Sequence, residues 1–417
     1  MQNSQYVEMM AQATRRASRS LRVVGGEVRN RILLRVAQLL REKSGEILVE
    51  NEKDLERARQ AGLSSAMLDR LTLTAARIEG MAVAVEEIAA FPDPLGRELS
   101  HYTSPVGLEI SKVTIPIGSI FFIYESRPNV TIDGAALCLK SGNAVILRGG
   151  KESAASSSIL AQLFRQAIEE SGVDRDAVQL VERGDHEIVS LLLQRSDALD
   201  AVIPRGGERL IRTVVEQSKI PVIKHYKGVC HLYIDREADF AKAEPILINA
   251  KTQRPGVCDA LETLLLDSAL PEEKQKLLIE ALLQKGVKLY GDEASRKLSS
   301  QIAPLRDGEW DREYLDLELA VKVVNGVEEA IAHIEEHGSG HTESIVTENS
   351  ATASLFLARV DSSSVMHNAS TRFSDGGMYG LGAEVGISTD KLHARGPMGV
   401  ESLTTYKWLV RGNGQIR

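Results

Sequence analysis

Residues 119–148 read SIFFIYESRPNVTIDGAALCLKSGNAVILR, and this stretch decides the class of the fold. Residues 119–124 form an apolar run of strand length, and residues 144–147 form a second, shorter run. The apolar segment 135–139 between them has the composition of a buried helix. Two strands separated by a helix indicate a crossover unit with parallel strands.

The same alternation of strands and helices continues along the chain. In the first half, further strands are expected at 178–181, 201–203 and 221–223, with a helix at 153–170. A second series follows residue 228, with strands expected at 232–234, 260–266, 319–324, 344–347 and 364–366, and helices at 240–250, 271–284 and up to His337. We therefore predict an α/β fold with two tandem parallel-sheet domains.

The two ends of the chain differ from this pattern. The first hundred residues show the apolar periodicity of helices, which stops at residues 91–94, Phe-Pro-Asp-Pro. Residues 108–112 alternate like the arm of a hairpin, and residues 404–410 indicate a terminal strand. These segments predict helices before the first sheet and a small additional β element.

Composition excludes several classes of protein. The 417 residues are 43% hydrophobic and 26% charged, as in soluble globular proteins. No apolar stretch reaches the about 18 residues of a membrane-spanning helix, and the first twenty residues do not read as a signal peptide. The net charge is −8, from 50 basic and 58 acidic residues, and the basic residues are dispersed. We therefore expect neither a membrane nor a nucleic acid as partner.

The three cysteines, Cys138, Cys230 and Cys258, are odd in number and widely spaced. This pattern is typical of free thiols in a reducing cytoplasm, which is the expected localisation.

Cys258 is the candidate nucleophile. Pro255 ends the helix before it and Gly256 permits a tight turn, so Cys258 is expected in a turn before a strand. Lys251 and Arg254 would supply the positive charge that favours a thiolate. The alternative is that Cys258 packs as a small hydrophobic residue, as Cys138 and Cys230 are expected to do.

Two turns have the composition of anion sites. Arg148-Gly149-Gly150-Lys151 joins a strand to a helix, where backbone N–H groups and the helix dipole attract a phosphate. Residues 204–209 repeat the theme with Gly206 and Gly207, and two such turns on neighbouring strands favour a dinucleotide. The alternative is a pair of ordinary strand–helix turns, since the glycine fingerprint after the first strand is absent.

His333 and His337 fit the H-x-x-E-H spacing of some zinc enzymes. The motif lies at a helix end just before Gly338, where histidines interact with the helix dipole. We therefore expect no metal there.

Several blocks together resemble the aldehyde dehydrogenase superfamily. These are residues 115–118, 141–148, the Gly206-Gly207 turn and Cys258 before a strand. Within the superfamily, five further blocks resemble the glutamate-5-semialdehyde dehydrogenase family: residues 124–131, 249–255, 338–343, 373–377 and 392–399. The resemblance extends from about residue 100 to about residue 410.

The resemblance implies an activity. The family reduces L-glutamyl 5-phosphate with NADPH to L-glutamate 5-semialdehyde and phosphate, the second step of proline biosynthesis. Cys258 matches the nucleophile that forms a thioester, and Asn129 is the nearest candidate for a side-chain donor to the oxyanion. The alternative is a related reductase of another activated acyl group, such as an acyl-CoA. An alternative of another class is a nucleotide-binding regulatory protein with an inert thiol.

The resemblance also implies the binding residues. For the cofactor NADPH these are Pro116, Arg148, Lys151, Gly206 and Gly207, and Arg148 would pair with the 2′-phosphate. For the substrate we expect Lys251 and Arg254 near the acyl phosphate and Asp375 near the ammonium. The alternative is that Arg254 is a surface residue and Asp375 forms a turn.

The chain departs from the superfamily pattern at two positions. The glutamate that activates water in a Glu-Leu-Gly-Gly-Lys block is missing from residues 225–229, which read His-Tyr-Lys-Gly-Val. This loss suits a reductase that must protect its thioester from water. The residue after the nucleophile is commonly Asn, and here it is Asp259, which we expect to point away from the thiol.

The implied architecture has three parts. Residues 1–102 and 119–227 would form the NADP-binding domain, and residues 228–385 the catalytic domain with Cys258. Residues 103–118 and 386–417 would form an oligomerisation arm that pairs with another subunit. The expected partners are a second copy, in a homodimer or dimer-based tetramer, and glutamate 5-kinase, which would hand over the substrate.

Overall fold

The computed structural model describes residues 2–224 and 226–417, and the chain forms two compact units. Unit 1 comprises Met1–Lys224, Gly380–Gly386 and Met398–Arg417, and unit 2 comprises His225–Tyr379 and Ile387–Pro397. Each unit holds a parallel sheet with helices, which confirms the predicted α/β fold with two tandem sheets. The functional roles assigned to the predicted domains stay predictions.

The sheet of unit 1 has the order β5-β4-β3-β6, with every pair parallel. Its strands are β3 (Ser119–Tyr124), β4 (Ala144–Arg148), β5 (Val178–Leu180) and β6 (Ala201–Arg205). The central strand β3 is buried along its whole length, as expected for a strand covered on both faces. The connecting helices are α6 (Asn129–Lys140), α7 (Ala154–Glu170), α8 (His186–Leu192) and α9 (Glu208–Gln217), with short 3-10 turns at Lys151–Ser153 and Arg175–Ala177.

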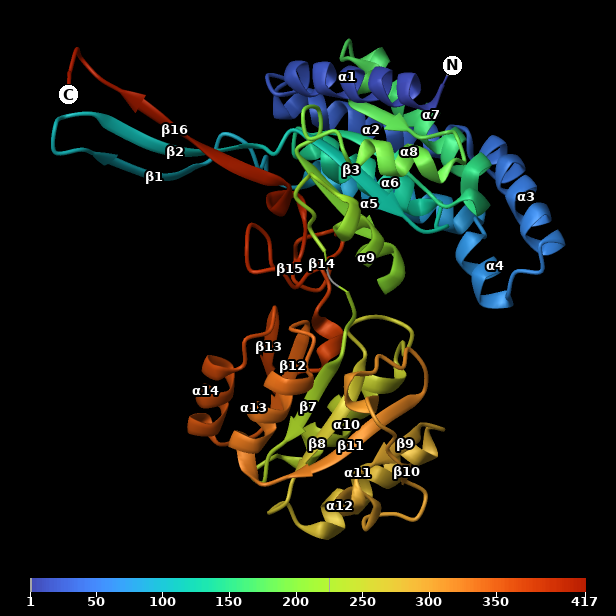
Figure 1. Cartoon of the computed structure of the whole chain (residues 1–417), viewed down its shortest axis with the longest axis vertical. Helices are drawn as coiled ribbons and strands as arrows, with labels where there is room; N and C mark the ends of the chain where they lie inside the picture. Colours follow the sequence, from blue (N-terminus) through green and yellow to red (C-terminus); the bar gives the residue numbers. More distant parts are fainter. Residues whose placement is uncertain (1, 225) are drawn as a thin grey trace. The chain divides into compact units, whose positions relative to one another are not determined.

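Helices precede this sheet in the described residues, as predicted (Figure 1). They are α1 (Asn3–Leu21), α2 (Gly26–Glu42), α3 (Ser44–Gln60), α4 (Ser65–Leu71) and α5 (Ala75–Ala90). Val7 and Met10 of α1 pack against Phe121 and Ile146 in the core of the sheet, whereas α2 and α5 pack against each other and against α6. No helix in the described residues is both long and apolar enough to span a membrane.

A three-stranded antiparallel ribbon forms the small β element of unit 1. Its order is β1-β2-β16, with β1 (Glu98–Thr103), β2 (Glu109–Pro116) and β16 (Thr404–Arg411). Figure 1 shows it extending away from the four-stranded sheet and its helices. Tyr102, Tyr406 and Trp408 remain about half exposed on it, and the Lys112 ammonium lies 3.6 Å from the centre of the Tyr406 ring.

The sheet of unit 2 is larger, with the order β10-β9-β11-β8-β7-β12-β13, again parallel. Its strands are β7 (Cys230–Ile234), β8 (Leu261–Asp267), β9 (Lys288–Gly291), β10 (Ala303–Pro304), β11 (Glu318–Val324), β12 (Thr342–Val346) and β13 (Ser364–His367). Its helices are α10 (Phe240–Thr252), α11 (Glu272–Gln284), α12 (Glu293–Arg296), α13 (Gly326–His337) and α14 (Ser350–Arg359). A two-stranded hairpin, β14 (Ile387–Ser388) with β15 (Gly396–Pro397), also belongs to this unit.

Three sequence predictions need correction. Residues 221–223 do not form a strand: Val222 makes a single parallel bridge to Val202, because Pro221 has no N–H to continue a ladder and the unit ends at Lys224. The strands β9 and β10 were not expected, since they are only four and two residues long. The strands β4 and β6, expected to be neighbours, lie on opposite sides of β3.

Asn143 connects three parts of unit 1. This fully buried residue precedes β4, and its Oδ1 accepts a hydrogen bond from the Gly118 N–H (2.7 Å) just before β3. Its Nδ2 donates to the Leu403 carbonyl (2.8 Å) just before β16 and to Ser141 Oγ (2.9 Å). One side chain therefore fixes the starts of two sheet strands and of the terminal strand.

Replacing Asn143 by Ala should lower the free energy of unfolding by about 2–5 kcal/mol, because the buried Gly118 N–H and Leu403 carbonyl lose their partner. Urea unfolding followed by circular dichroism measures this loss. Asn413→Ala on the exposed C-terminal segment is the control and should change the free energy by less than about 0.5 kcal/mol. Equal stabilities of the two variants would contradict the connecting role of Asn143.

Candidate active site

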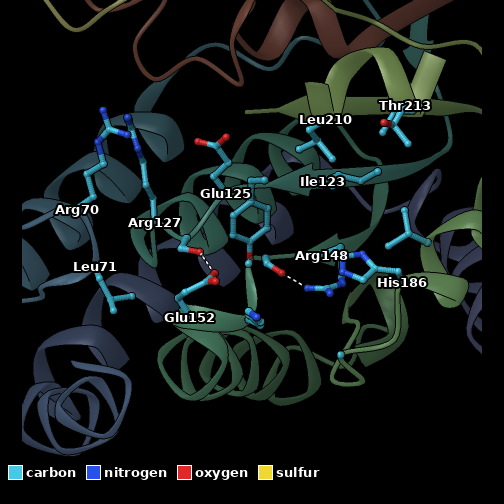
Figure 2. A pocket seen from close by; sticks show the side chains of 18 of the residues that line it. Arg70, Leu71, Ile123, Glu125, Arg127, Arg148, Glu152, His186, Leu210 and Thr213 are labelled. Atoms are coloured by element: carbon cyan, nitrogen blue, oxygen red, sulfur yellow. Dashed lines mark hydrogen bonds between the residues drawn. The ribbon is translucent and has the colours of Figure 1, made fainter. Parts of the chain in front are cut away.

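A cavity of about 690 Å³ opens at the carboxyl ends of β3 and β4 in unit 1 (Figure 2). Residues from α4, α8 and α9 complete its wall. A second cavity of about 650 Å³ shares the turn 148–151 with the first and adds Arg57 and Arg183. Cavities of this size at the carboxyl edge of a parallel sheet are where cofactors bind in α/β proteins.

The turn Arg148-Gly149-Gly150-Lys151 has the properties of an anion site. A Cβ at Gly150 would lie 2.0 Å from Ser126 Oγ, so the backbone here passes closer to its neighbours than a side chain allows. Arg148 Nη1 donates to the Gly149 carbonyl, while its buried Nε has no hydrogen-bond partner within residues 2–224 and 226–417. Burial lowers the pKa of Arg148. A guanidinium with an unused donor and a bare backbone turn fit a phosphorylated nucleotide.

Charged side chains frame the first cavity. In the view of Figure 2, Arg70 and Arg127 lie on one side of it, and Arg148 lies on the other with His186. Glu125 and Glu152 lie among them; Glu152 accepts a hydrogen bond from Ser126, and Glu125 accepts one from the Gly207 N–H at 2.6 Å. The wall of the cavity thus contains both positively charged side chains and carboxylates, and the carboxylates are hydrogen-bonded to neighbouring residues.

The other predicted cofactor residues lie at different distances from these cavities. Lys151 lines both of them. Gly206 and Gly207 follow β6 on the other side of β3, and their link to the first cavity is the bond from Gly207 to Glu125. Pro116 ends β2 and is buried outside both cavity walls as the described residues define them.

Asn129, the predicted oxyanion donor, is the first residue of α6. Its Nδ2 donates to Asp133 Oδ2 at 3.0 Å, one turn further along the same helix. Burial raises the pKa of Asp133 to about 6. The structure therefore gives Asn129 a local partner, and its catalytic role stays a prediction.

Cys258 lies in unit 2, in the turn that connects α10 to β8, and is partly exposed. Cys138 and Cys230 are fully buried, and burial raises the pKa of both thiols, that of Cys138 to about 12. The neutral Cys230 thiol donates to the Cys258 carbonyl at 3.2 Å. Of the three cysteines, Cys258 is the one that lies in a turn and is exposed enough to contact a ligand.

Lys251, a predicted substrate residue, does not lie on an open surface. Its side chain is fully buried, and its Nζ donates to the Leu261 carbonyl (2.8 Å) and to Glu262 (3.0 Å). Burial lowers the pKa of Lys251 and raises that of Glu262 to about 7, because the loss of solvation outweighs the attraction between the two groups. Lys251 is part of the interior beneath the nucleophile turn.

The other two predicted substrate residues are exposed. Arg254 lies at the surface of the turn before Cys258. Asp375 Oδ1 accepts from the N–H groups of Gly377 (2.9 Å) and Met378 (3.2 Å), which is the turn-forming role considered as the alternative. Asp375 also lines a cavity of about 260 Å³, whose wall sequence reasoning did not anticipate: Asn249, Gln253, Arg372, Phe373 and Met378 complete it.

Asp259, the residue directly after Cys258, forms an ion pair with Arg372, and both side chains are mostly buried. The negative charge beside the nucleophile therefore has a positive partner. The missed residues lie in or beside two of the sequence blocks: Gln253 is within the block 249–255, and Arg372 directly precedes the block 373–377. Their cooperation depends on the packing of α10 against the 3-10 turn Thr371–Phe373, which no local pattern reveals.

The stretch 225–229 begins with His225, which lies outside the described residues. Further along it, the Gly228 N–H donates to Glu313 Oε1 at 2.8 Å. The stretch itself has no glutamate, but Glu313 from another segment lies next to it. The Glu313 carboxylate is hydrogen-bonded to the backbone of the stretch.

The histidines of the H-x-x-E-H motif have protein partners. His333 Nδ1 lies 3.1 Å from Lys322 Nζ, and burial lowers the pKa of His333 to about 2. His337 pairs with Asp311 at 3.0 Å. The described residues contain no group of three or more His, Cys, Asp or Glu side chains arranged to hold a metal ion.

Comparison with known proteins identifies the family. The sequence model described as the aldehyde dehydrogenase family matches residues 1–307, well over half of the chain. The chain belongs to the aldehyde dehydrogenase family. The resemblance seen in the sequence blocks is therefore confirmed.

Within this family, three relatives that are 41–51% identical to the chain are described as gamma-glutamyl phosphate reductases. A gamma-glutamyl phosphate reductase from Desulfotalea psychrophila is 51% identical over 93% of this chain and 92% of its own length. One from Idiomarina loihiensis is 48% identical over the whole of both chains. The crystal structure of a gamma-glutamyl phosphate reductase from Thermotoga maritima matches with a TM-score of 0.97 at 41% identity, over 99% of each chain.

Replacing Lys251 by Met should lower the free energy of unfolding by about 3–5 kcal/mol, because Glu262 remains buried without its counter-charge. The double variant Lys251→Met/Glu262→Gln should recover most of this loss. Urea unfolding measures both. A Lys251→Met protein of unchanged stability but raised KM for substrate would show instead that Lys251 contacts the substrate.

Proposed function

We propose that the chain catalyses the NADPH-dependent reduction of L-glutamyl 5-phosphate to L-glutamate 5-semialdehyde and phosphate, the second step of proline biosynthesis. The observation that carries this proposal is a partly exposed Cys258, held in a turn by Gly228 and Cys230, in a chain about half identical to gamma-glutamyl phosphate reductases over its full length. Free thiols at all three cysteines agree with a cytoplasmic enzyme.

Cys258 would act by covalent catalysis. Its thiolate attacks the acyl carbon, the C–S bond forms, and the bond from that carbon to the phosphate oxygen breaks to release phosphate. Two-electron reduction of the resulting thioester gives a thiohemiacetal, which breaks its C–S bond to return the thiolate and the aldehyde. The backbone N–H of Cys258 is the natural donor to the developing oxyanion, and Asn129 is proposed as the second.

The cavities of unit 1 would hold the cofactor. The backbone N–H groups of Gly149 and Gly150 would donate hydrogen bonds to the phosphates, and Arg148 and Lys151 would supply positive charge for them. The Gly206-Gly207 turn orients Glu125 in the cavity wall through its hydrogen bond. When bound, NADPH supplies the hydride for the reduction.

Protection of the thioester is the third requirement of the proposal. One carboxylate oxygen of the nearby Glu313 accepts a hydrogen bond from the Gly228 N–H. A carboxylate held in this way is a weaker general base, which supports reduction rather than hydrolysis as the fate of the thioester.

The exposed ribbon β1-β2-β16 is proposed as the arm that pairs two subunits in a homodimer or dimer-based tetramer. Its half-exposed aromatic residues are suited to such an interface, as are the outer edges of β1 and β16, which pair with no further strand among the described residues. Delivery of the labile acyl phosphate by glutamate 5-kinase remains part of this proposal.

The function is tested by running the reaction backwards. Glutamate semialdehyde and inorganic phosphate should reduce NADP, and omission of phosphate should stop the reaction. An aldehyde of equal length without the amino-acid head group should react slower by a factor on the order of a thousand, because buried polar partners would be left unpaired. Activity that depends on coenzyme A instead of phosphate would establish the alternative, an acyl-CoA reductase.

Cys258→Ala should abolish turnover and leave the circular dichroism spectrum unchanged, because the side chain acts in the chemistry and lies in a partly exposed turn. Cys138→Ala, a change within the core of α6, is the control and should retain catalysis. Cys230→Ala removes a weak donor to the Cys258 carbonyl and a 3.7 Å contact to His341 Nδ1, and should lower kcat by less than about tenfold. Substantial turnover by Cys258→Ala would exclude the thioester mechanism.

Arg148→Ala should weaken binding of NADPH more than that of NADH. A charge-assisted contact to the 2′-phosphate corresponds to about 1.5–3 kcal/mol, or roughly a tenfold to hundredfold loss for NADPH. Fluorescence titration with both cofactors measures it, and Lys151→Ala tests the neighbouring cation in parallel. Equal losses for the two cofactors would show that Arg148 does not recognise the 2′-phosphate.

A further inference from the structure

Arg372 is held beside the nucleophile turn by two residues of that turn. Its Nε donates to Gln253 Oε1 at 2.9 Å, and its Nη1 donates to Asp259, the residue directly after Cys258. The arginine side chain is only 15% exposed and that of Asp259 only 5%. The plane of the guanidinium is therefore fixed from two sides, close to the thiol.

The third nitrogen of this group is unused. Among the described residues, Nη2 of Arg372 makes no hydrogen bond, and the side chain lines the cavity of about 260 Å³ together with Asn249 and Met378. A mostly buried guanidinium in a cavity wall, with one nitrogen left to donate, is suited to an anionic ligand.

Two arginines and two aspartates determine the charge around the cavity. Asp259 compensates Arg372, and Arg254 lies close enough to add a second positive charge, which together with burial lowers the pKa of Arg372. Asp375, the acidic residue of the cavity wall, has one carboxylate oxygen engaged by two backbone N–H groups. A phosphate dianion can accept the free N–H of a fixed guanidinium and is attracted by both arginines.

We propose that Arg372 binds the phosphate group of the acyl phosphate through Nη2, and that Asp259 and Gln253 are positioning residues that orient the guanidinium. This inference rests on the proposed function and names the residue that recognises the leaving group. The other anionic group of the same substrate is its α-carboxylate, and the two assignments give different kinetics.

The test measures the reverse reaction with inorganic phosphate and glutamate semialdehyde varied independently. In Arg372→Gln, the KM for phosphate should rise roughly tenfold to a hundredfold, as for loss of one charge-assisted contact, while the KM for the aldehyde changes less than about threefold. Arg372→Lys should recover part of the loss, because it restores the charge without the planar fork. Arg359→Gln, on the exposed face of α14, is the control of equal charge change.

Two variants of Asp259 distinguish a role in orienting Arg372 from a role in protein stability. Asp259→Ala should raise the KM for phosphate, because the guanidinium loses its anchor. Asp259→Asn keeps an acceptor for Nη1 and removes a negative charge near the phosphate, so the KM for phosphate should equal that of the wild type or fall below it. A rise in Asp259→Asn as large as in Asp259→Ala would contradict the positioning role.

A binding measurement without turnover completes the test. Inorganic phosphate should slow alkylation of Cys258 by iodoacetamide in the wild type and in Arg359→Gln, but not in Arg372→Gln at the same concentration. A wild type without phosphate-dependent activity would refute the proposed function itself. An active enzyme whose Arg372→Gln variant keeps its KM for phosphate and its protection, or raises the KM for the aldehyde instead, would overturn the role of Arg372.

Discussion

The position of Cys258 depends on the absence of a side chain at Gly228. A Cβ at that residue would lie 1.8 Å from the Cys258 carbonyl oxygen and 2.9 Å from its Cα, and neither backbone atom can move away as the end of a flexible side chain would. The same carbonyl accepts a hydrogen bond from the thiol of Cys230, which lies two residues after Gly228 and begins β7. The start of β7 thus supports the nucleophile turn from below through backbone contact and one weak hydrogen bond.

The support continues into a polar layer within the core of unit 2. His231 donates through its backbone N–H to Glu343 Oε2 (2.7 Å) on the adjacent strand β12, and its Nδ1 lies 3.0 Å from the same oxygen. Burial raises the pKa of Glu343, as it does for Glu262 beside Lys251. Buried polar groups contribute little net stability, but each of them accepts only one arrangement of its partners. The contacts of His231 with Glu343 therefore fix β7 against β12, and the pair of Lys251 with Glu262 fixes α10 against β8 on the two sides of the turn that carries Cys258.

The sequence predicted the architecture well because periodicity reports burial. The strand at residues 119–124 was predicted to the residue, since six successive buried positions leave an uninterrupted apolar run. The turn at Cys258 followed from Pro255 and Gly256, whose backbone constraints are local. The order of the strands in the sheet could not be predicted in the same way, because the hydrophobic pattern of a strand does not show which strands are its neighbours. In the sheet of unit 1, β3 lies between β4 and β6.

For the site residues, too, local features were predictable from the sequence and contacts between distant segments were not. Lys251 lies in a block that resembles the family, yet its ammonium is buried against Glu262. The pairing of a helix residue with a strand residue does not show in either segment alone. Arg372 and Asp259 are 113 positions apart in the chain, and the packing of residues 371–373 against α10, β7 and β12 brings them together. Local chemistry identifies which residue types are present, whereas pairing across the fold decides which of them face a ligand.

The two phosphate sites proposed for this chain differ in construction for a physical reason. In unit 1, the glycine backbone and the cations at the strand end would bind a cofactor through many contacts that do not change during the reaction. A leaving phosphate must be held while its bond to carbon breaks and must then depart. An arginine already neutralised by Asp259 offers one directed hydrogen bond with limited net charge, which stabilises the departing group without retaining it. The aspartate beside the nucleophile, where Asn is common, would therefore act on release of the leaving group through Arg372 rather than on the thiol itself.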